Sequence, residues 1–279
     1  MRHRRWAAAL ALAAASAVST ASARAAEDNA YPDWSGQWVR VGGAQFDPSK
    51  PPGLGQDAPL TPEYKAKFEQ ALAKKPADAT DNSPTARCFP AGMPRVMIAI
   101  EPMEIVIKPN ITAVIHSYQN EFRRIWTDGD SWPEDMEQAF DGLSIGHWEG
   151  KDAQGRFTTL AVETRGLNGP RAFDDSGLPL ADDNETVVVE KISLDPADAD
   201  TLRDEITTTD HALTKPWTVT RTYHRNRDAV WVEHVCAASK STMVIGGETY
   251  AISVDGFLKP TRPGQPAPDL KFFKSATGK

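Results

Sequence analysis

Histidines placed near carboxylates are the residues of this chain that could perform acid–base chemistry. His147 and Glu149 alternate along one β-like stretch, and Glu163 lies in the next. A carboxylate beside an imidazole sets its tautomer and raises its pKa, which an acid–base pair requires. Each residue also has a structural interpretation, as a solvated cross-strand pair or a turn residue. The candidate acids and bases are His147, His116, Glu149, Glu163, Asp128 and His211.

A run of aromatic and basic residues between 112 and 126 predicts the lining of a binding pocket. In an unbroken strand, alternate residues share one face, which would place His116, Tyr118, Phe122, Arg124 and Trp126 together. A bulge or turn at Asn120 would undo this assignment after Tyr118. The expected pocket is lined by His116, Tyr118, Arg124, Trp126, His147 and Trp148, with Arg124 binding an anionic group and Arg171 in a polar loop as a further candidate.

Alternating runs rich in Thr, Val and Ile predict the elements that must position these side chains. Gly-, Asp- or Pro-rich breaks separate the runs, and no strand–helix rhythm of a parallel sheet is present. The fold class is therefore all-β, an antiparallel meander forming a barrel or a strongly curved sheet. Strands are expected at 33–40, 104–108, 112–118, 121–127, 144–149, 156–164, 186–194, 201–209, 217–225 and 230–236.

One short N-terminal helix and a tail complete the expected domain. Thr61 as N-cap and Pro62 at the first helical position predict a helix over about 61–75. The stretch of about 258–279 contains four prolines and is expected to form an irregular tail. A single β-rich domain over 26–279 follows.

The first 25 residues predict export. Arginines precede an Ala- and Leu-rich run over 6–18, and Ala23-Arg24-Ala25 offers the small-x-small pattern that signal peptidase cleaves. A run of this length is too short to span a bilayer permanently. We expect a cleavable signal peptide over 1–25, a periplasmic location and no stable membrane insertion.

Charge excludes one class of partner. Removing the four arginines of 1–25 changes the formal net charge from −7 to −11. A dispersed acidic surface repels nucleic acid, so no nucleic-acid partner is expected. The chain also has no GxSxG elbow, Walker loop, GxGxxG or HExxH. Neither a cofactor nor a metal is expected, although His147, Glu149 and His116 could bind a metal across strands.

The chain has two cysteines, Cys88 and Cys236, and the expected periplasmic location is an oxidising compartment. The expected state is one disulfide that closes a loop of about 150 residues and stabilises the fold by about 2–5 kcal/mol. The alternative is a free nucleophilic thiol.

Several short motifs resemble a widespread family of secreted bacterial proteins of unassigned function. They are Arg123-Arg124-Ile125-Trp126-Thr127-Asp128-Gly129, Ser144-Ile145-Gly146-His147-Trp148-Glu149-Gly150, Thr214-Lys215-Pro216-Trp217-Thr218-Val219 and Glu233-His234-Val235-Cys236. The resemblance covers roughly residues 88–275 and implies export and a β-rich domain, but no reaction. Two departures are Asp130, where that family usually has Arg, and an expanded turn after Gly150.

The motif Gly36-x-Trp38 resembles the Gly-x-Trp motif in the first strand of lipocalin-like barrels. In those barrels the Trp closes one end against a late basic residue, for which Arg221 or Arg225 could serve. Barrels of about eight strands can hold one small ligand.

The expected function is therefore binding of a small hydrophobic or aromatic molecule in a barrel pocket. The alternative is a cofactor-free acid–base enzyme, such as a lyase, hydratase, isomerase or hydrolase, that uses a His/carboxylate pair in the same pocket. A second alternative is a structural or assembly partner in the cell envelope, which predicts an exposed apolar patch instead of a cavity.

Overall fold

The structure is a computed structural model, and it describes residues 30–43, 45–74, 89–99, 101–129, 131–168, 185–228, 242–252 and 257–269. The chain divides into two compact units, Met1–Glu233 and His234–Lys279. The signal peptide over 1–25, the Cys88–Cys236 disulfide, Arg171 and the strand over 230–236 lie outside the described residues. These four predictions, and the single domain over 26–279, stay predictions.

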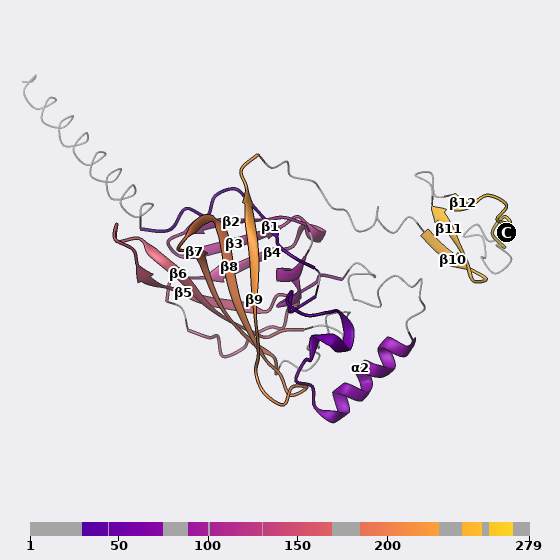
Figure 1. The fold of residues 1–279 in the computed structure, drawn as a ribbon, viewed down its shortest axis with the longest axis horizontal. Helices are drawn as coiled ribbons and strands as arrows, with labels where there is room; N and C mark the ends of the chain where they lie inside the picture. The colour runs from indigo at the N-terminus through magenta and orange to yellow at the C-terminus, as the bar shows by residue number, and fades with distance from the viewer. Residues whose placement is uncertain are drawn as a thin grey trace, which may run out of the picture. The chain divides into compact units, whose positions relative to one another are not determined.

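Nine strands of the first unit form a closed barrel in sequence order (Figure 1). Closure comes from β9, which pairs with β1 in antiparallel fashion. The prediction of a β-meander barrel is confirmed. The strands are β1 (Gln37–Arg40), β2 (Met103–Lys108), β3 (Ile111–His116), β4 (Phe122–Trp126), β5 (Leu143–Lys151), β6 (Phe157–Arg165), β7 (Val187–Asp195), β8 (Asp198–Thr209) and β9 (Trp217–Asn226).

One pair of neighbours departs from the meander, because β4 and β5 run parallel. Their ladder is short and joins only Ile125 to Ser144 and Trp126 to Ile145. A parallel pair needs a long connection that carries the chain back along the barrel, and residues 127–142 supply it. The consequence is that the end of β4 lies beside the beginning of β5.

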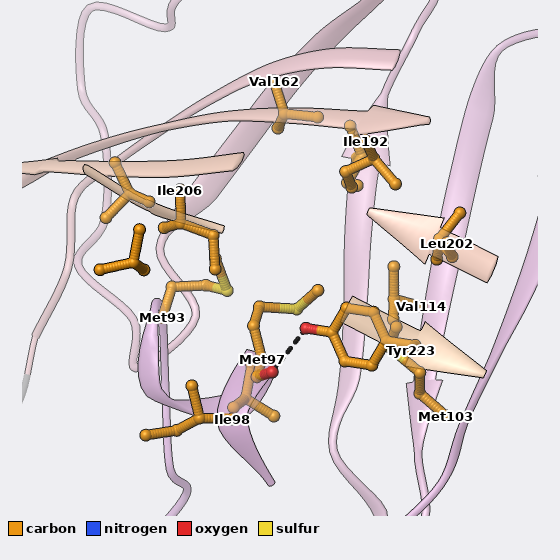
Figure 2. Packing of buried hydrophobic residues seen from close by; sticks show 14 of the residues in the cluster. Met93, Met97, Ile98, Met103, Val114, Val162, Ile192, Leu202, Ile206 and Tyr223 are labelled. Atoms are coloured by element: carbon orange, nitrogen blue, oxygen red, sulfur yellow. Dashed lines mark hydrogen bonds between the residues drawn. The ribbon is translucent and has the colours of Figure 1, made fainter. Parts of the chain in front are cut away.

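The barrel interior is filled by side chains of the strands and of the strap, which we define as residues 91–99. Figure 2 shows Met93 and Met97 of the strap pointing toward strand residues such as Ile206 and Tyr223, and Ile98 belongs to the same buried cluster. The Tyr223 hydroxyl on β9 donates a hydrogen bond of 2.5 Å to the carbonyl oxygen of Met97. The strap therefore closes the barrel with apolar side chains.

The predicted contact between the first strand and a late basic residue is present. Trp38 is fully buried, and the guanidinium of Arg225 lies 4.5 Å from the centre of its ring. Arg221, the other candidate, instead donates hydrogen bonds to the carbonyl oxygens of Gln45 and Phe46. Arg225 thus makes the contact with Trp38.

Helix α2 (Pro62–Lys74) forms where the sequence predicts it. The Tyr64 amide donates to the Thr61 hydroxyl at 3.4 Å, as expected for an N-cap, and Pro62 is the first helical residue. Phe68 is buried and forms the apolar contact of the helix.

The second unit contains a three-stranded antiparallel sheet of β10 (Thr242–Ile245), β11 (Glu248–Ile252) and β12 (Leu258–Pro260). β12 lies in the stretch for which an irregular tail is predicted. In the described part of the chain, no helix is long and apolar enough to cross a membrane.

Candidate functional site

A tight turn between β3 and β4 decides which side chains enter the barrel. Gln119 and Asn120 adopt the left-handed backbone conformation, with φ of 53° and 55°. Non-glycine residues are uncommon there, although Asn tolerates it better than most. The turn shifts the alternation of side chains, so that Arg123 and Ile125 point inward and are almost fully buried.

The single face predicted for the aromatic and basic residues is therefore wrong after Tyr118. His116 points into the barrel, whereas Phe122, Arg124 and Trp126 lie on the outer surface of β4. Tyr118 is half-buried against the core. The physical reason is the turn at Asn120, which breaks the period of two.

The two predicted pocket residues that face inward are enclosed by other side chains. Burial lowers the pKa of His116 to about 3, and the positive charge of Arg123 adds to this effect. The imidazole is therefore neutral. Trp148 is half-buried and packs against Trp34 and Tyr31, with ring centres 5.1 Å and 5.3 Å apart.

The predicted His/carboxylate pair lies on the outer surface of β5 and β6. Nε2 of His147 lies 3.5 Å from a carboxylate oxygen of Glu149, and the two side chains are 74% and 45% exposed. Glu163 forms an ion pair with Arg165 instead. Because His116 is inside the barrel and His147 outside, the two histidines cannot act on one ligand or bind one metal.

The remaining predicted acids and bases are also separated. Asp128 is exposed after the end of β4. His211 lies between β8 and β9, where its Nε2 is 2.7 Å from the Tyr64 hydroxyl and its Nδ1 is 3.3 Å from Glu185. His211 therefore joins helix α2 to this loop, an interaction that serves the fold.

Arg123 is the centre of a buried ionic cluster that the sequence did not reveal. Its guanidinium binds both oxygens of Glu190, one of them at 2.9 Å. It also donates to the hydroxyls of Thr164 at 3.0 Å and Ser144 at 3.2 Å. The charges of Arg123 and Glu190 therefore balance each other inside the barrel.

Asp204 on β8 adds a second carboxyl group to this cluster. It is fully buried, and neither carboxylate oxygen has a hydrogen-bond partner among the described residues. Burial, and then the negative charge of Glu190, raise the pKa of Asp204 well above its usual value. The protonated form is favoured, and this form can donate its proton to the neighbouring Glu190.

The described residues also form a cleft of about 500 Å³ beside β4, which we call the β4 cleft. It is lined by β4 and by the residues that come just before β4 and β5. Aromatic side chains and two acids line it together with Arg124. The lining residues are Pro90, Gln119, Asn120, Glu121, Phe122, Arg123, Arg124, Trp126, Ala139, Phe140, Asp141, Gly142 and Leu143.

The two acids of the β4 cleft influence each other. Glu121 is 6% exposed, and its pKa is raised to about 7 by burial and then by the negative charge of Asp141. Burial also raises the pKa of Asp141, and the positive charge of Arg123 opposes this rise. A carboxyl group that titrates near neutral pH in a cleft, as Glu121 does, is a candidate for binding or proton transfer.

Glu121 also anchors the strap at the edge of the cleft. Its carboxylate accepts hydrogen bonds from the amides of Ala91 and Gly92. Gly92 has φ +67°, and a Cβ atom there would lie 2.5 Å from the Phe140 carbonyl oxygen. Glycine therefore permits the close approach that brings the strap against the cleft wall.

Two other hollows lack this combination. One, of about 450 Å³, lies beside β2 and contains Asp33, whose pKa is lowered by the hydrogen bond that it accepts from the Ser35 hydroxyl. The other, of about 320 Å³, lies against helix α2, and its acids Asp57 and Glu69 are exposed. The β4 cleft is therefore the strongest candidate site among the described residues.

The sequence interpretation missed Glu121 and Asp141, although it proposed Arg124 and Trp126 from the same cleft. A usable signal was present, because each acid stands one or two residues before a strand. Only the parallel pairing of β4 and β5 brings the residues just before these two strands together. A meander of antiparallel strands would have separated them.

No protein-family model matches this chain, and no curated protein matches its sequence significantly. The resemblance to a family of secreted bacterial proteins stays a prediction, and what the structure does establish is a closed, largely antiparallel nine-stranded β-barrel.

Proposed function

We propose that this protein binds a small hydrophobic or aromatic molecule in the β4 cleft. The observation that carries the proposal is the convergence of Phe122, Trp126 and Phe140 on a cleft that also holds two acids, the buried Glu121 and the half-buried Asp141. Small-molecule sites are typically concave and largely apolar, with a few polar groups that fix orientation. The proposed site differs from the barrel pocket expected from the sequence, because apolar side chains of the strap pack against strand residues inside the barrel.

Benzyl alcohol, a neutral aromatic probe, tests this proposal by NMR titration of the full-length chain. Trp126→Ala removes the largest aromatic wall of the cleft, so we expect the affinity to fall at least about tenfold, which corresponds to about 1.4 kcal/mol. Trp132→Ala is the matched control, because Trp132 packs under Arg165 outside the cleft. Equal affinity of the two variants would contradict the proposal.

A second candidate function is cofactor-free acid–base catalysis in the same cleft, as in a lyase, hydratase, isomerase or hydrolase. It is favoured by the pKa of about 7 at Glu121, because a general acid or base works best near the operating pH. Native mass spectrometry of the protein isolated from exporting cells would identify a retained molecule. Consumption of that molecule at an unchanged rate by Glu121→Gln would contradict catalysis by this residue.

We also retain the proposal that the protein is exported to the periplasm. The leader pattern over 1–25 supports it. N-terminal sequencing of the protein from a periplasmic extract should find a chain that begins near Ala26. A chain that retains Met1 would contradict cleavage.

A further inference from the structure

We propose that the β4 cleft selects molecules in which a protonated amine is attached to an aromatic body, and that Glu121 and Asp141 bind the ammonium group. This inference rests on the proposed function and names the chemical class of its ligand. It replaces the earlier expectation that Arg124 binds an anionic group in the pocket.

The balance of hydrogen-bond donors and acceptors in the cleft supports an ammonium ligand. Oδ1 of Asp141 is buried and has no hydrogen-bond partner among the described residues. Each oxygen of Glu121 accepts one backbone amide, from Ala91 or Gly92, and a carboxylate oxygen has room for a second donor. An unpaired buried acceptor is unfavourable. An ammonium group brings three donors and no acceptor, so it complements both acids.

Among the described residues, the cations near the cleft offset this negative charge only in part, because burial outweighs the effect of Arg123 on the pKa of Asp141. Arg123 is committed to Glu190 and to the hydroxyls inside the barrel. The guanidinium of Arg124 lies 4.9 Å from the centre of the Phe122 ring, on the exposed side of β4. Arg95 on the strap lowers the pKa of Glu121, but its effect is smaller than those of burial and of Asp141.

The aromatic walls are suited to the same ligand. Trp126, Phe122 and Phe140 line the cleft beside the two acids. Aromatic faces attract cations and also pack against aromatic rings. A carboxylate ligand would instead meet like charge at Glu121 and Asp141, which disfavours it.

The affinity for an amine should depend on pH. The ammonium group favours the ionised form of Glu121, whose pKa is about 7 in the empty cleft because of burial and Asp141, with Arg95 and the two backbone amides acting in the opposite direction. Binding therefore releases a proton below this pKa, and the affinity should rise from pH 6 to pH 8. The amine itself remains protonated over this range, as a lysine side chain does.

Isothermal titration of the full-length protein with benzylamine, benzyl alcohol and benzoate tests the inference. At pH 8 we expect benzylamine to bind at least tenfold more tightly than benzyl alcohol, and benzoate to bind most weakly. At pH 6 the preference for benzylamine should shrink at least threefold. Asp141→Asn and Glu121→Gln should each reduce the preference, whereas Glu149→Gln, which changes an exposed acid outside the cleft, should leave it unchanged.

The possible outcomes separate the two proposals. Benzyl alcohol binding at least as tightly as benzylamine at pH 8 would overturn the inference and leave the proposed function standing. No binding of any of the three probes would overturn the proposed function. If Glu121→Gln loses the preference and Asp141→Asn keeps it, the inference is overturned. If both variants lose the preference, the inference is supported, because Asp141→Asn does not touch the strap bonds. Thermal melts of both variants show whether they fold.

Discussion

Two charged residues at the start of β4, Glu121 and Arg123, lie only two positions apart but have different surroundings. Inside the barrel, Arg123 and Glu190 neutralise each other, and hydroxyl groups complete the hydrogen bonds of Arg123. In the β4 cleft, Glu121 lies beside the like charge of Asp141, and one oxygen of Asp141 has no partner among the described residues. The Arg123–Glu190 pair therefore serves the fold, whereas the β4 cleft has bonding capacity that a ligand can use.

The largest expected effect is the loss of stability when the inward-facing arginine of β4 is replaced, compared with replacement of the outward-facing arginine beside it. Arg123→Met leaves Glu190 as an unpaired buried charge, so we expect the free energy of unfolding to fall by about 3–5 kcal/mol. Arg124→Met, at the adjacent exposed position, should change it by less than about 0.5 kcal/mol. Urea denaturation of both variants measures the difference. Similar losses would show that the inner and outer arginines are not distinct.

The next effect concerns the pH dependence of stability. Because the pKa of Glu121 is raised from 4.5 to about 7 in the folded state, the folded protein binds the proton more tightly than the unfolded chain. Its stability therefore falls as pH rises from about 4.5 to about 7, by about 3 kcal/mol in all.

Glu121→Gln carries no titrating group at this position, so this component of the fall should disappear. Urea denaturation at intervals from pH 4.5 to 8 would detect the change in slope. Glu149→Gln, at the exposed acid of β5, should keep the slope of the parent protein. Parallel pH profiles for Glu121→Gln and the parent would contradict the raised pKa of Glu121.

A smaller effect is expected inside the barrel at Asp204. Its raised pKa means that the folded state keeps the carboxyl group protonated, and asparagine has the same shape without the charge. At pH 5, Asp204→Asn should change the free energy of unfolding by less than about 1 kcal/mol. At pH 8 the variant should be more stable than the parent, since stability of the parent falls with rising pH. A variant less stable than the parent at pH 8 would refute this protonation state.

The smallest effect is expected at His147. Its contact with Glu149 is highly exposed, and exposed ion pairs contribute about 0–1 kcal/mol. His147→Gln should therefore change the free energy of unfolding by less than about 0.5 kcal/mol and leave benzylamine affinity unaltered. A tenfold loss of benzylamine affinity in this variant would instead place the ligand site beside His147, on the outer surface of β5.

Much of the fold could be predicted from local patterns. Alternation of apolar residues located all nine barrel strands to within a few residues, and Thr61-Pro62 located the beginning of helix α2. The spacing of Gly36 and Trp38 anticipated the contact with Arg225. These features depend on signals between residues that are close in sequence, namely the alternation of apolar residues in strands and the capping residues of a helix.

The site could not be predicted in the same way, because it depends on two departures from regularity. The left-handed turn at Gln119 and Asn120 reverses which residues of β4 point into the barrel. The alternation of side chains along a strand does not indicate where such a turn occurs. The parallel pairing of β4 with β5 then brings Asp141 to Glu121. Arg124 and Trp126 were selected for an interior pocket and line an outer cleft instead.

The most direct test of the account is a ¹⁵N NMR titration of the full-length protein with benzylamine at pH 8, read at two indole N–H groups. Trp126 lines the β4 cleft, whereas the indole of Trp38 is fully buried and donates to the Trp34 carbonyl oxygen at 3.0 Å. We expect saturable shifts for the Trp126 indole and the Gly142 amide, and none for the Trp38 indole. Saturable shifts of the Trp38 indole without any shift of the Trp126 indole would place the ligand inside the barrel and contradict binding in the β4 cleft.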